Sequence, residues 1–116
     1  MLDPFPFGGG VTILESLGLL TPTITFPDDQ TVPELASGMI QTLFNTIPAN
    51  SNHLSVLISK LILGSHNNFK SIIIDLVENQ IHYRRALSYS VNSLFDQRAS
   101  IIEWESAIEN IYQTLL

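Results

Sequence analysis

Three histidines, His53, His66 and His82, are the residues of this sequence most suited to binding a metal ion. Glu78 and His82 lie four residues apart, so on a helix both side chains would share one face. Two ligands are too few, because a protein metal site needs three or four. His53 and His66 fall at a helix cap or in a loop, from where they could complete a cluster. We expect an ordinary helix-surface pair, with no metal and no other cofactor.

The sequence has one cluster of basic residues, in segment 82–85, where Arg84 and Arg85 are adjacent. Arginine can bind a phosphate through two parallel hydrogen bonds. Four consecutive residues cover more than one helical turn, however, so they cannot all face one ligand. We expect Arg84 and Arg85 to make polar contacts on a solvated face or salt bridges between subunits. The acids considered for such salt bridges are Glu103, Glu105 and Glu109.

The sequence offers no set of nucleophile, base and orienting residue. Serine and threonine are abundant, but they stand mainly at expected helix caps. Glu105 and Glu109 share a helix face, yet no pattern places them in a buried site. Cysteine is absent, which excludes disulfides and thiolate chemistry. The run Gly8–Gly10 lacks the Lys-Ser/Thr of a phosphate loop and reads as a flexible joint. We therefore expect a protein that is not an enzyme.

Composition limits the classes of partner. Of the 116 residues, 45% are hydrophobic and only 14% are charged, against about 25% charged in a typical domain. Either serine, threonine, asparagine and glutamine cover the surface, or part of the apolar surface is covered by a partner, and the second possibility matters more for function. A net charge of −6 disfavours direct nucleic-acid binding. No apolar run reaches the roughly 18 residues of a membrane span. The first residues, with Asp3, Pro4 and Pro6, do not resemble a secretory signal. We expect the protein inside the cell or within an assembled particle such as a virion.

The last fifty residues contain neither glycine nor proline and are predicted to be helical. A single helix would be about 75 Å long, which exceeds a domain of this size. Serine and asparagine accumulate within Ser88–Ser100, so a break is expected there. Ser100 with Glu103 forms a capping-box pattern for a restart. We predict helices near Asn68–Ser90 and Ser100–Leu115, with 92–99 either a bend or continuous helix.

Two further helices precede this stretch. Thr31, Pro33 and Glu34 mark the start of one at Val32–Ile47, which Pro48 ends. A second is predicted at His53–Leu63, with Gly64 at its C-terminal cap. The apolar residues of both recur at helical spacing, so each has one face for a core.

The first thirty residues are predicted to form an extended arm rich in proline and glycine. A short helix near Ile13–Leu19, capped by Thr12, is expected within it. Residues 21–27 read as an extended or edge segment between prolines, and 28–30 as a turn. Large apolar side chains are costly to leave in water, at about 1.5–3 kcal/mol each. We predict that this arm docks in a groove on its own domain or on a neighbouring chain, and that the C-terminal helix also docks on protein. The apolar contact residues predicted are Leu2, Phe5, Phe7, Ile24, Phe26, Trp104 and Tyr112.

The fold predicted is all-α: a small bundle of about four helices in residues 31–116, one of them long, behind the arm of residues 1–30. The function predicted is that of a structural or assembly protein, a homo-oligomer or a subunit of a larger complex. A tail, neck or head-joining component of a virus or phage particle fits this description by analogy of build. The alternative is a helical adaptor that binds one protein partner through an apolar groove.

Overall fold

A computed structural model of the chain describes residues 1–4, 8–26, 31–64 and 66–116, without the side chains of 31–33, 66, 97, 99 and 100. The described residues are mostly helical, which confirms the predicted class, but they form more than four helices. The α-helices are α1 (Val11–Gly18), α2 (Thr31–Thr46), α3 (Asn52–Ser59), α4 (Phe69–Glu78), α5 (Gln80–Ser90) and α6 (Gln97–Leu115). Three 3-10 turns connect them, η1 (Ala49–Ser51), η2 (His66–Asn68) and η3 (Val91–Phe95).

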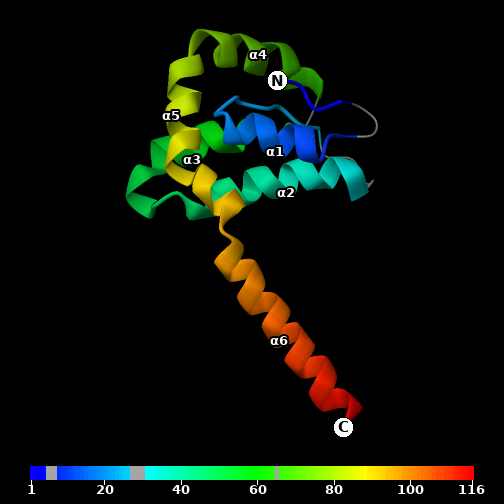
Figure 1. Cartoon of the computed structure of the whole chain (residues 1–116). Coiled ribbons are helices and arrows are strands. Elements are labelled where there is room, and N and C mark those ends of the chain that lie inside the picture. Colours follow the sequence, from blue (N-terminus) through cyan, green and yellow to red (C-terminus); the bar gives the residue numbers. More distant parts are fainter. Residues whose placement is uncertain (5–7, 27–30, 65) are drawn as a thin grey trace.

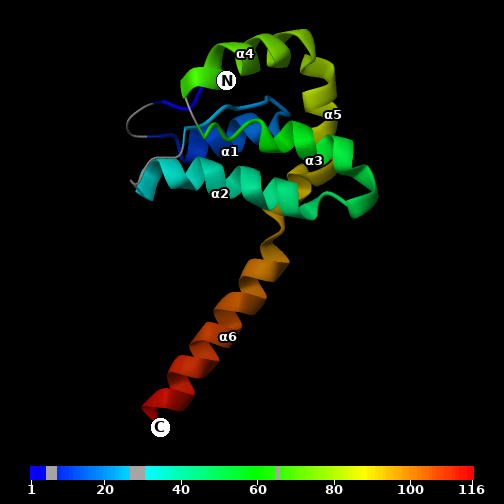
Figure 2. The same ribbon diagram turned by 180° about the vertical axis from the view of Figure 1, so that it is seen from behind.

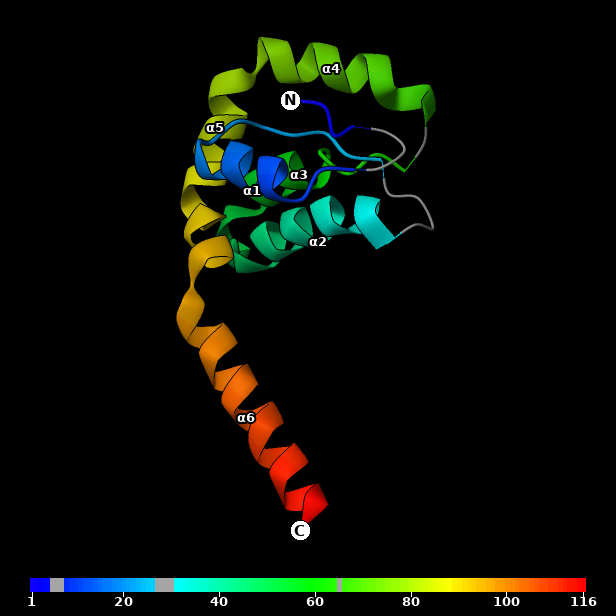
Figure 3. The same cartoon turned by 45° about the vertical axis from the view of Figure 1, so that its right-hand side comes forward.

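The molecule consists of a packed body and one projecting helix. Helices α1 to α5 form the body, and α6 extends away from it in every view (Figures 1–3). The radius of gyration is 16.2 Å, against about 13 Å for a compact chain of this length. The excess follows from α6, all of whose described side chains are exposed.

The core of the body is aliphatic and draws on every helix except α4 and α6. α4 adds half-buried isoleucines and Leu76 to its edge. Tyr83, on α5, is the largest fully buried side chain among the described residues. Gly18, near the end of α1, allows this helix to approach η3 closely. A Cβ at Gly18 would lie 3.0 Å from Cζ of Phe95.

Three short extended segments run beside one another through the body. Leu2 pairs in parallel with Ile24, and Thr25 pairs in parallel with Ile62. The segment around Ile24 is therefore the middle one of three and is buried, whereas an edge position was predicted. The pairing also corrects the predicted helix His53–Leu63. It ends at Ser59, because Leu61 O and Leu63 N bond to Thr25, and Gly64 caps no helix.

The N-terminal segment packs on its own chain. Ile13 and Leu17 of α1 are fully buried, and Thr25 donates a 2.7 Å hydrogen bond to Asp3. The described residues before α2 thus do not show a separate arm. Gly10, instead of Thr12, occupies the N-cap of α1. Phe5, Phe7 and the predicted turn at 28–30 lie outside the described residues.

The predicted helix Asn68–Ser90 is two helices that meet at Asn79. α4 and α5 run in different directions on the two sides of this residue (Figures 1 and 2). Asn79 N–H closes α4 on Asp75 O at 2.9 Å, and the Asn79 carbonyl accepts from His82 N at 2.9 Å. A straight helix would carry α5 past the core. The break instead lets Tyr83, Ala86 and Leu87 pack inside.

The second break, predicted within Ser88–Ser100, is confirmed. α5 ends at Ser90, and η3 leads to Asp96, whose extended backbone separates the body from α6. Asp96 Oδ1 accepts a 3.0 Å hydrogen bond from Arg98 N and so caps α6. The restart therefore lies at Gln97 and not at Ser100.

Candidate functional site

α6 carries an apolar stripe whose side chains are all exposed. Its members recur at alternating steps of three and four residues, the spacing of a coiled-coil seam. Trp104, the second member of the stripe, is 70% exposed. The stripe is formed by Ile101, Trp104, Ile108, Ile111 and Leu115, with Tyr112 beside it. A helix with such a face is stable in proteins mainly when the face packs on something.

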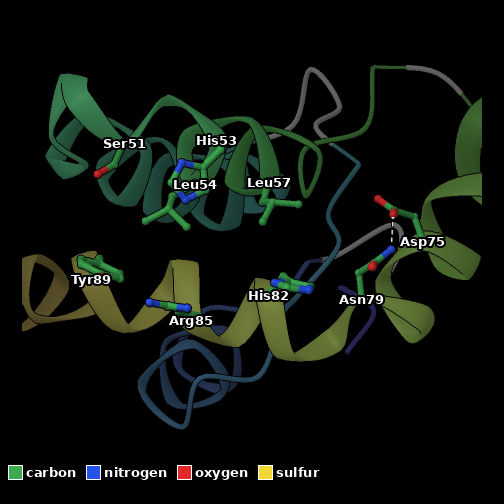
Figure 4. A pocket seen from close by; sticks show the side chains of 9 residues that line it. All are labelled: Ser51, His53, Leu54, Leu57, Asp75, Asn79, His82, Arg85 and Tyr89. Atoms are coloured by element: carbon green, nitrogen blue, oxygen red, sulfur yellow. Dashed lines mark hydrogen bonds between the residues drawn. The ribbon is translucent and has the colours of Figure 1, made fainter.

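A groove lies on the body between α3 and α5, with a volume of about 480 Å³. Figure 4 shows the residues of the two helices facing across it. Leu54 and Leu57 of α3 supply its apolar surface. The polar residues that line it are Ser51, His53, Asp75, Asn79, His82, Arg85 and Tyr89. This volume is in the usual range, about 300–1,000 Å³, for sites that bind a ligand.

Asp75 fixes one end of the groove through three bonds. Its Oδ2 accepts from Tyr83 OH at 2.7 Å and pairs with Lys60 Nζ at 2.9 Å. Its Oδ1 accepts from Asn79 Nδ2 at 2.7 Å. The carboxylate thereby joins α4 to α5 and to the end of α3. It is satisfied within the chain and acts as structural support for the groove wall.

The hydrogen bonds decide the protonation of this cluster. Donation by Tyr83, followed by that from Lys60, lowers the pKa of Asp75. Burial, with the Asp75 charge beside it, raises the pKa of Tyr83. Asp75 is therefore ionised and Tyr83 neutral at physiological pH. Neither group changes its protonation near pH 7, so the pair is not suited to act as a general acid or base at that pH.

Arg85 supplies unpaired positive charge to the middle of the groove. Its side chain is exposed and forms no ion pair with a carboxylate among the described residues. His53 and His82 stand on opposite walls near it (Figure 4). Since Lys60 neutralises Asp75, the free charge of the groove is positive. Such a groove favours an anionic partner with apolar groups.

The predicted contact residues are dispersed. Trp104 and Tyr112 lie exposed on α6, and Leu2 is exposed on the body. Ile24 is buried in the core of its own chain. Phe26 packs on Phe69, with ring centroids 5.3 Å apart. Ile24 therefore offers no free surface for a partner, whereas Phe26 is only partly buried.

The two arginines separate in the structure. Arg85 lines the groove, whereas Arg84 lies near the Met1 amine. Burial, with the charge of Arg84, lowers the pKa of that amine, which donates to Pro22 O at 2.6 Å. Only Arg85 is thus placed to meet a partner in the groove.

The histidines and carboxylates do not gather into a metal site. Among the described side chains, no group of three His, Cys, Asp or Glu residues is close enough to hold an ion. Glu78 ends α4 and does not line the groove that holds His82. The described part of the chain also contains no helix with the length and hydropathy to cross a membrane.

Sequence reasoning missed the cluster at the end of the groove. Asp75, Asn79 and Tyr83 are spaced four residues apart, a signal that places them in one row along a helical segment. Lys60 carries no such signal, because its pairing with Asp75 depends on how α3 and α4 come together. The groove as a whole likewise depends on the packing of α3 against α5.

Comparisons with known proteins give no relative for this chain. No protein-family model matches it, and no match was found among curated proteins or solved structures.

Proposed function

We propose that this chain is a non-enzymatic structural or assembly protein that packs on protein, first of all on copies of itself, through α6. The observation that carries the proposal is the unpartnered stripe of α6. Five large apolar side chains follow one line of this helix, and each is more than half exposed. Burying such side chains gains about 1.5–3 kcal/mol each, so a partner that covers them would be bound and would stabilise the helix.

The sequence predicts docking through both the N-terminal segment and the C-terminal helix, and the exposed stripe favours the C-terminal helix, α6. Ile13, Leu17 and Ile24 already fill the core of their own chain, so this segment supports the body. Asp96 holds α6 away from that body. Subunits that consist of a packed body and a projecting amphipathic helix can assemble by exchanging that helix.

Trp104 provides a direct test, since it is the only tryptophan in the sequence. We would measure solution mass by light scattering, and acrylamide quenching of Trp104, across a series of protein concentrations. Assembly through α6 predicts a mass above the 12.9 kDa of one chain and protection of Trp104 as the mass rises. A monomer with an accessible Trp104 at every concentration would contradict assembly of this protein with itself.

The second candidate is an adaptor that captures one protein partner in the groove between α3 and α5. The observation in its favour is the free positive charge of Arg85 above the apolar Leu54 and Leu57. In this case the chain is a monomer, and Arg85→Glu abolishes binding of the partner while α6 is dispensable for it.

A further inference from the structure

We propose that the groove between α3 and α5 is the acceptor for α6 of a second copy of this chain. This inference rests on the proposed function and names the surface that α6 occupies. Each copy would place its projecting helix in the groove of the other. Two copies that exchange α6 in this way close into a symmetric pair.

Charge complementarity selects this acceptor. α6 carries Glu103, Glu105 and Glu109 against the single base Arg98, which leaves a net charge of −2. At about 100° per residue, Glu105 borders one side of the stripe, and Glu109 lies further round the same side of the helix. The groove presents Arg85 without an ion-pair partner among the described residues. A helix that lays its stripe over the half-buried Leu57 would thus bring the carboxylate of Glu105 to the side of the groove that holds a free guanidinium.

A competing acceptor lies beside the N-terminal segment, and no arginine or lysine lines it. It is a smaller apolar hollow of about 190 Å³ between the first residues and α4. Its lining consists of Met1, Leu2, Ile24, Ile73, Leu76 and Val77. Its charged group is the Met1 amine, which already donates to Pro22 O at 2.6 Å and whose pKa is lowered by burial and by Arg84, so it is a less available partner for the glutamates of α6 than Arg85. A direct pairing of two α6 stripes is the other competitor, and it leaves Arg85 unused.

Single substitutions in the full chain separate these possibilities. Arg85→Glu reverses the charge in the groove, and Lys70→Glu makes the same change at an exposed site on α4 outside it. Ile108→Gln breaks the stripe, while Ile102→Gln alters the same residue type off the stripe. Ile108 and Ile102 are 60% and 65% exposed, so neither change disturbs the core.

The expected result is that Arg85→Glu and Ile108→Gln each weaken association about tenfold or more, equivalent to about 1.4 kcal/mol, and that both controls associate as the natural chain does. Mass would be measured by analytical ultracentrifugation, with Val77→Glu as the probe of the competing hollow. Continued association of Arg85→Glu alongside loss in Ile108→Gln would overturn the groove as acceptor while leaving assembly through α6 intact. If Val77→Glu lost association and the other variants kept it, the groove as acceptor would be overturned too.

Mixing the two weakened variants gives the decisive readout. The Arg85→Glu chain keeps an intact α6, and the Ile108→Gln chain keeps an intact groove. We expect each alone to be monomeric and the mixture to form a one-to-one complex through one restored contact. Absence of that complex would overturn the proposal. A natural chain that is monomeric throughout would overturn both this inference and self-assembly.

Discussion

The hydroxyl of Tyr83 donates a 2.7 Å hydrogen bond to Oδ2 of Asp75, across the break between α5 and α4. The same oxygen pairs with Lys60 at the end of α3. One carboxylate therefore sets the mutual position of three helices. The groove between α3 and α5 owes its shape at this end to that position.

Replacing Tyr83 by phenylalanine removes the hydrogen bond and keeps the buried ring. We expect the free energy of unfolding to fall by about 1–2 kcal/mol, in the lower part of the range for a bond to a charged group, because Asp75 is partly open to water. Urea unfolding measures this. The control is Tyr89→Phe on the same helix, since Tyr89 is exposed and its hydroxyl has no partner among the described residues. Equal loss in both variants would contradict a role for the Tyr83 bond.

Acid should weaken the body through Asp75. The hydrogen bonds from Tyr83 and Lys60 lower its folded pKa, whereas an aspartate in the unfolded chain titrates near 3.9. The unfolded state therefore takes up the proton first as pH falls. The stability contributed by Asp75 is present above about pH 4 and is lost as pH falls through the lower folded pKa. Urea midpoints from pH 7 to pH 2.5 should decline more steeply for the natural chain than for Asp75→Asn, and parallel curves would argue against this account.

Leu17 and Leu19 test whether the N-terminal segment belongs to the body. Leu17 is 0% exposed and Leu19, two residues later, is 75% exposed. We expect Leu17→Ala to cost about 2–5 kcal/mol, because it empties part of the core. The same change at Leu19 should remain within about 0.5 kcal/mol. The measurement is thermal or urea unfolding, and a neutral Leu17→Ala would mean that α1 does not support the fold.

Asp96→Ala should affect α6 and spare the body. The substitution removes the cap on Arg98 N, at a cost of about 0.5–2 kcal/mol to the helix. Since α6 has no tertiary support in a single chain, we expect lower far-UV ellipticity at dilution, with an unchanged urea midpoint of the body. Ser106→Ala, inside the same helix, should keep or raise the ellipticity. A midpoint that shifts for Asp96→Ala would show that α6 is coupled to the body.

Local signals placed most of the helices in this sequence. α2 begins where Thr31, Pro33 and Glu34 predict a start, and Pro48 follows its end, because capping and ring constraints act within one turn. The serine-rich interval predicted a break between α5 and α6 for the same kind of reason. The apolar face of α6 could also be predicted, because the spacing of its apolar residues depends only on their order in the sequence.

Tertiary packing decided the rest. Leu61 to Leu63 follow a helical pattern, yet pairing with Thr25 makes them extended, because a buried backbone needs its hydrogen bonds met wherever partners lie. The predicted helix is broken at Asn79, because the change of direction there lets both α4 and α5 pack against the core. The groove has no sequence signature, since Arg85 and Leu57 come from helices that meet only in the folded body. The sequence by itself determined the helical class and the apolar face of α6. The placement of the N-terminal segment and the charge that faces α6 arose from contacts between residues distant in the chain.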